Sequence, residues 1–133
     1  MTRILSLFND LQKAASKLQE ATQAPATELN RDATIQRFEF TFELAWKLMH
    51  AILQDQGIEA YGPKNTLREA AKLGIISDPD HWFATLYDRN LTTHKYDEKT
   101  AEAIYARAKE FVKTVTDLIK TIQAQYLQTT SAS

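Results

Sequence analysis

The stretch Arg37–Leu53 reads RFEFTFELAWKLMHAIL and decides the fold class of the chain. Apolar side chains in and just before it recur at steps of three and four residues, which is the spacing of one buried face of an α-helix. Other large apolar residues occupy further faces of the same helix. We therefore predict a central, deeply buried helix that ends at Gly57. The first face comprises Ile35, Phe38, Phe42, Ala45, Met49 and Ile52, and the other faces carry Phe40, Leu44, Trp46 and Leu48.

The same periodicity continues on both sides of this segment. Breaks in it coincide with helix start and stop signals, such as Pro25, Gly74 and the pair Asp78-Pro79. The fold class predicted from this periodicity is all-α. Its helices are expected over residues 4–18, 28–56, 66–73, from 79 toward 89, and 98–127, with a loop over 58–63.

The last of these helices has the most regular pattern. Its apolar residues step three and four without a slip, as in a heptad seam. At roughly 1.5 Å per residue the helix would be about 45 Å long, so part of the seam is expected to pack on a second subunit, unless its last turns fray. Residues 1–128 are expected to form a single domain and residues 129–133 a disordered tail. The seam comprises Ala101, Ile104, Ala108, Phe111, Val115, Leu118 and Ile122.

Composition narrows the classes of function. The chain has 16 Lys and Arg against 17 Asp and Glu, a net charge of −1, so any nucleic-acid contact must be local rather than based on overall charge. It has no cysteine, which excludes disulfides, thiolate zinc sites and a cysteine nucleophile. The N-terminus does not resemble a signal peptide, and no apolar run has the length of a membrane span. A cytoplasmic protein without a membrane partner is expected.

Reactive side chains concentrate between Asp88 and Tyr96. Arg89 offers a planar, permanently charged fork that matches phosphate oxygens, and His94 can exchange a proton near neutral pH. Together they suit metal-independent cleavage of an RNA phosphodiester, with the histidine as base and the arginine stabilising the phosphorane. The five-residue spacing would require a helix end or a paired subunit. The spacing alone favours a simpler interpretation, a salt bridge from Arg89 to Asp88 or Asp97 with His94 as a helix cap.

Three blocks of sequence carry a resemblance to a known family. They are RFEFTFELAWKLMHAIL (37–53), GPKNTLREAAKLGII followed by DPDHW (62–82), and RNLTTHKYDE (89–98). In this order they resemble the nucleotidyltransferase substrate-binding proteins of the HEPN superfamily, which include the HepT-like toxins. The resemblance covers most of the chain.

This resemblance implies an antiparallel up-and-down bundle of four or five helices that forms a homodimer and acts as a ribonuclease toxin. By resemblance to the motif Arg-x4-His-x-Tyr, Arg89 and His94 would be catalytic, Asn90 would assist, and Tyr96 would accept an adenylyl group. The implied partners are an RNA substrate and a minimal nucleotidyltransferase that serves as antitoxin. No cofactor is expected. The alternative function is a non-catalytic subunit that binds substrate or nucleotide for that nucleotidyltransferase, and a purely structural helical adaptor is a third reading.

Two further polar stripes are candidate contacts for RNA or the partner. Lys64, Arg68 and Lys72 are spaced four apart and would form a basic stripe, although a solvated face is the favoured explanation for them. On the central helix, Glu39, Glu43, Lys47 and His50 could line the cleft, contact Arg89 or bind the partner. An ordinary ion pair from Glu43 to Lys47 is the simpler alternative.

A metal site is not expected. Carboxylate-bridged di-metal bundles need a Glu followed three residues later by His, and no Glu of this chain has that spacing. Asp78 and His81 have it, but they straddle a helix start.

Overall fold

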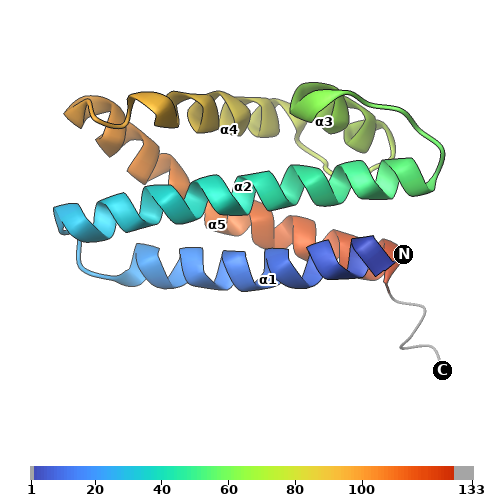
Figure 1. Cartoon of the computed structure of the whole chain (residues 1–133), viewed down its shortest axis with the longest axis horizontal. Helices are drawn as coiled ribbons and strands as arrows, with labels where there is room; N and C mark the ends of the chain where they lie inside the picture. Colours follow the sequence, from blue (N-terminus) through green and yellow to red (C-terminus); the bar gives the residue numbers. More distant parts are fainter. Residues whose placement is uncertain (1, 128–133) are drawn as a thin grey trace.

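The computed structural model describes residues 2–127, which fold into an all-α, antiparallel bundle (Figure 1). This confirms the predicted fold class. None of the helices within this range is both long and apolar enough to cross a membrane. The expected tail over 129–133 lies outside the described residues. In chain order the elements are α1 (Thr2–Gln23), α2 (Glu28–Asp55), α3 (Gly62–Lys72), α4 (Pro79–Leu91), the 3₁₀ turn η1 (Thr92–His94) and α5 (Glu98–Tyr126).

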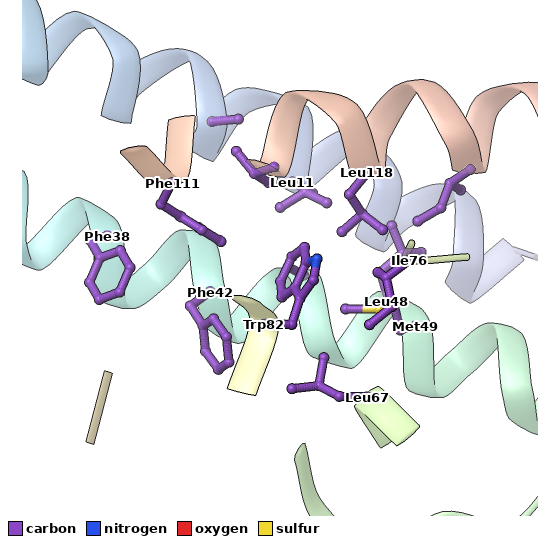
Figure 2. Packing of buried hydrophobic residues seen from close by; sticks show 14 of the residues in the cluster. Leu11, Phe38, Phe42, Leu48, Met49, Leu67, Ile76, Trp82, Phe111 and Leu118 are labelled. Atoms are coloured by element: carbon purple, nitrogen blue, oxygen red, sulfur yellow. The ribbon is translucent and has the colours of Figure 1, made fainter. Parts of the chain in front are cut away.

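The central position predicted for Arg37–Leu53 is confirmed, because α2 contacts all four other α-helices. Its Phe38 and Phe42 meet Trp82 of α4 and Phe111 of α5 in the core (Figure 2). Phe111 lies edge-on to Phe38 and to Trp82, with ring centroids 5.3 and 5.6 Å apart. Edge-on geometry sets the positive rim of one ring against the negative face of the next, so the rings attract beyond simple burial.

The seam of α5 is buried within a single chain. All seven of its residues from Ala101 to Ile122 are buried, and α5 packs on both α1 and α2. The seam itself therefore needs no second subunit, contrary to the expectation from its length. The reason is that α1 and α2 are themselves long, 22 and 28 residues, and cover it along its length.

Local signals explain most helix boundaries. Thr27, Asp78 and Asp97 each accept a hydrogen bond from a backbone N–H of the first turn of α2, α4 and α5. Gly57 and Gly74 follow α2 and α3 with φ of 76°, a conformation that L side chains rarely adopt.

The predicted start of α3 was wrong. The helix begins at Gly62 and not at Thr66, so the loop before it is shorter than expected. Pro63 fits the first turn because it needs no hydrogen-bonded N–H there, and Thr66 donates its hydroxyl to the Gly62 carbonyl at 2.8 Å. Tyr61 at the N-cap makes no side-chain capping bond, so the sequence carries no capping signal at this point.

The aromatic cluster provides a test of the core. Replacing the buried Phe111 with Ala should lower the free energy of unfolding by about 3–5 kcal/mol, because a large cavity would open among its neighbouring rings. The matched control is Phe40→Ala on the exposed face of α2, where 58% of the residue is accessible. That change should cost less than about 0.5 kcal/mol. Urea titrations at one fixed protein concentration would measure both, and equal losses would contradict the assigned core.

Candidate functional site

The motif residues lie where α4 gives way to α5. Arg89 stands in the last turn of α4, His94 ends η1, and Tyr96 follows in the turn before Asp97 caps α5. The Thr92 hydroxyl donates to the Arg89 carbonyl at 2.7 Å, which satisfies an acceptor that the end of α4 leaves open. The motif thus spans a helix end. This is one of the two arrangements, a helix end or a paired subunit, that the spacing of Arg89 and His94 required.

Arg89 is held by α2 through one side of its guanidinium. Its Nε donates to Oε1 of Glu43 at 3.0 Å, and both side chains are partly buried. The other oxygen of Glu43 accepts a hydrogen bond from Trp46 Nε1, also at 3.0 Å. Within the described residues the two terminal nitrogens of Arg89 make no hydrogen bond. They are the pair that can donate together to two oxygens of one phosphate.

This geometry corrects two expectations. Arg89 pairs with neither Asp88 nor Asp97, because Asp88 accepts from Arg107 Nη1 at 3.1 Å and Asp97 caps α5. Glu43 does not pair with Lys47 within α2, since its two oxygens bind Arg89 and Trp46.

His94 and Tyr96 are both exposed and lie next to each other. The imidazole Nδ1 is 3.4 Å from the phenol oxygen, and the rings meet edge-on with centroids 5.9 Å apart. A contact of this length is a weak hydrogen bond at most. When Nδ1–H faces the phenol oxygen, the lone pair resides on Nε2, which makes no hydrogen bond to any described residue. His94 can then accept a proton at Nε2.

Three ion pairs tie this junction to α2. Arg31 pairs with Glu98, Glu39 with Lys95 at 2.9 Å, and Glu43 with Arg89. Each pair has at least one side chain that is a third or more exposed, and ion pairs in contact with water contribute little to stability. Their main effect here is positional, because they fix the α4–α5 junction against the most buried helix of the bundle. The side chain of Asn90 is exposed and makes no hydrogen bond within residues 2–127.

Asp88, next to Arg89, anchors the end of α4 to α5. Its carboxylate accepts two hydrogen bonds from Arg107, both at 3.1 Å, while its side chain is only 8% exposed. Burial raises the pKa of Asp88 above its usual value, and the charge of Arg107 opposes this shift in part. At the next helix start the opposite holds: hydrogen bonds from the backbone and hydroxyl of Thr100 lower the pKa of Asp97.

The basic stripe of α3 lies apart from the motif. Lys64, Arg68 and Lys72 are exposed, and none contacts a motif residue. Arg68 donates to Asn65 at 3.1 Å, and Lys72 pairs with Glu69 at 3.0 Å. Lys47 of α2 is also exposed and makes no ion pair in the part of the chain described.

Sequence reasoning missed two residues that support the site. Trp46 donates a hydrogen bond to the second oxygen of Glu43. Their spacing of three residues on one helix could have indicated this contact. Arg107 anchors Asp88 from α5, and no local pattern pointed to it.

Among residues 2–127 no group of three or more His, Asp or Glu side chains is placed to hold a metal ion.

The fold defines the class of protein as an all-α, antiparallel helical bundle. A family model described as nucleotidyltransferase substrate binding protein like matches residues 6–124, so the chain belongs to that family. The resemblance of its sequence blocks is thereby confirmed. A relative called probable ribonuclease HepT, from Haemophilus influenzae, is 43% identical over 83 residues, which cover 59% of this chain and 57% of the relative. The match thus spans little more than half of that protein.

Two solved structures share the fold along nearly their whole length. A Thermus thermophilus protein is 32% identical with a TM-score of 0.80, covering 85% of this chain and 98% of its own. A Haemophilus influenzae protein is 30% identical with a TM-score of 0.69, covering 92% and 98%. The latter is described as having the fold of a substrate binding domain of a nucleotidyltransferase.

The buried carboxyl of Asp88 gives the site a pH signature. Because its pKa is raised above 3.8, the folded protein binds this proton more tightly than the unfolded chain. The group therefore contributes stability that is present below 3.8 and lost as pH rises through the raised pKa. Asp88→Asn keeps an oxygen for Arg107 but does not titrate. Urea unfolding at several pH values should show wild type losing stability relative to Asp88→Asn as pH rises, and a constant difference would contradict this.

Proposed function

We propose that this protein is a metal-independent endoribonuclease of the toxin type, acting in the cytoplasm as a homodimer and controlled by a minimal nucleotidyltransferase. Arg89 and His94 are its catalytic residues, and Asn90 assists them. Membership of the family and the similarity to a protein named as a probable ribonuclease support this proposal. Neither the activity nor the dimer follows from the family alone. The chemistry of the motif residues supports the activity.

The observation that carries the proposal is the state of the two catalytic side chains. Arg89 is oriented by Glu43 through Nε alone, so both terminal nitrogens remain for a phosphate. His94 is exposed, with Nε2 unengaged among the described residues. A histidine that capped a helix would instead place a ring nitrogen on a helix carbonyl, and no such bond to His94 is present among the described residues.

The reaction assigned to these groups is transesterification within RNA. His94 takes the proton of a ribose 2′-OH, and the 2′ oxygen attacks the adjacent phosphorus. Arg89 donates to the oxygens on which charge grows. The bond from phosphorus to the 5′ oxygen breaks, that oxygen takes a proton from water, and the protonated His94 returns its proton to the hydroxide that remains. The products are a 2′,3′-cyclic phosphate and a 5′-hydroxyl, with no metal required.

Tyr96 is proposed as the point of control. Its side chain is 82% exposed and its hydroxyl lies 3.4 Å from His94, so it is accessible to a partner enzyme and adjacent to the catalytic base. An adenylyl group on this oxygen would bring a bulky anion into the space that an RNA phosphate must occupy, and would exclude RNA by volume and by charge.

The alternative is a non-catalytic subunit that binds substrate or nucleotide for the nucleotidyltransferase. The similarity to a structure described as a substrate binding domain favours it. Both functions use the same surface, and they differ only in whether His94 performs chemistry.

Substitution of His94 tests the ribonuclease. His94→Ala should lower the rate of RNA cleavage in EDTA by about 10²-fold or more, because it removes the general base. It should also relieve the growth arrest caused by expressing the wild type without a partner. Circular dichroism and gel filtration of both proteins would show whether fold and dimer are retained.

The matched control is His81→Ala. His81 is a histidine of α4 that bonds to Thr114 of α5, away from the motif. Cleavage by this variant should stay close to wild type. A folded, dimeric wild type that leaves RNA intact and growth normal would reject the ribonuclease and leave the binding subunit in its place.

Modification of Tyr96 tests the proposed control. Incubation with the cognate nucleotidyltransferase, ATP and Mg²⁺ should add an adenylyl group to Tyr96 and abolish RNA cleavage, with the modification followed by peptide mass spectrometry. Tyr96→Phe should not be modified. The control Tyr87→Phe removes another exposed tyrosine, on α4, and should be modified normally. Equal labelling of all three proteins would mean that another residue is the acceptor.

A further inference from the structure

A recess lies at the C-terminal end of α2, outside the motif. It is a pocket of about 480 Å³ between the last turns of α2 and the loop that leads into α3. Its walls carry an aromatic ring, an imidazole, an amide and a carboxylate, a set that can both stack on and hydrogen-bond to a planar heterocycle. These side chains belong to Tyr61, His50, Gln54 and Glu59.

Tyr61 presents the open wall of this pocket. It is 77% exposed, and its ring makes no contact with another ring or with a cation among the described residues. Its hydroxyl reaches Glu59 at 3.4 Å, and its carbonyl accepts from Asn65 at 3.0 Å, which fixes the backbone at the start of α3. A large, exposed aromatic side chain on a fixed backbone is a platform for stacking.

His50 forms the inner wall and is held in one orientation. Its Nε2 faces the Ala60 carbonyl at 3.0 Å and therefore donates, so the lone pair of the neutral ring resides on Nδ1. The ring lies edge-on to Trp46, with centroids 6.1 Å apart. The His50 side of the pocket is thus fixed in one orientation.

The pocket and the motif are connected along one stripe of α2. Glu43, Trp46 and His50 follow one another at helical spacing, and Glu43 is the residue that binds Arg89. Seven residues separate Glu43 from His50, about 10 Å along the helix axis. Lys47 lies between them, exposed and without an ion pair among residues 2–127. A single strand of RNA running from Arg89 to Tyr61 would pass close to the Lys47 ammonium group.

We propose that this pocket holds a nucleobase of single-stranded RNA, stacked on Tyr61, a few nucleotides from the phosphate bound at Arg89. Gln54 and Glu59 bond to the edge of the base, and Lys47 contacts the intervening backbone. Unpaired bases stack on aromatic side chains and expose their edges, whereas a duplex hides both. The inference rests on the proposed RNA substrate, but it concerns binding and not cleavage.

The test measures binding in a protein that cannot cleave. In the His94→Ala background, adding Tyr61→Ala should weaken the Kd for a short, fluorescently labelled single-stranded RNA by roughly five- to a hundred-fold, the range for loss of one stacked base. Tyr61→Phe should retain affinity, since it keeps the ring. Tyr87→Ala, on α4, is the matched control and should bind as tightly as the background protein. Anisotropy titrations at one fixed salt concentration would measure all four.

A duplex of the same sequence separates stacking from a general loss of affinity. Tyr61→Ala should leave duplex binding unchanged, because paired bases cannot reach the ring. Equal weakening of single strand and duplex, equal Kd for Tyr61→Ala and its background, or no measurable binding to RNA would each overturn the proposed subsite. If the ribonuclease proposal alone is wrong, the outcome differs: wild type binds RNA in a way that depends on Tyr61 but does not cleave it.

Discussion

The packing of α2 against four other helices is the constraint on which the rest of the structure depends. A helix of 28 residues that meets α1, α3, α4 and α5 must be apolar over most of its circumference. Only a narrow strip remains for polar side chains, and that strip faces the α4–α5 junction and the loop before α3. Glu39, Glu43 and His50 stand on it, and each bonds to a residue outside α2. The most buried element of the bundle therefore also positions its reactive residues.

The fold was largely predictable because its signals are local. The seam of α5 and the buried face of α2 follow from periodicity, and Thr27, Asp78 and Asp97 mark three helix starts. The start of α3 was missed because Tyr61 provides no capping side chain. The length of α5 also led to a wrong prediction. Its seam was expected to pack partly on a second subunit, but the chain's own long helices cover it.

The place of the candidate residues at a helix end was predictable from their spacing, but their contacts were not. The resemblance named Arg89 and His94, while the partner of Arg89 remained open among Asp88, Asp97 and Glu43. Helical spacing favoured a pair within α2, yet Glu43 lies 46 residues before Arg89 and reaches it only in the folded chain. Such contacts depend on the rotation of two helices about their axes, which periodicity fixes only approximately. The same holds for Arg107, whose bond to Asp88 sets the end of α4.

The junction that carries Arg89, His94 and Tyr96 lies outside the aromatic core, and this separation has a consequence for evolution. The rings of Phe38, Phe42, Trp82 and Phe111 hold the bundle together without using any motif side chain. Selection can therefore alter the exposed turn after α4 while the core stays intact. The same bundle can thus carry different chemistry at this turn without any change in its core.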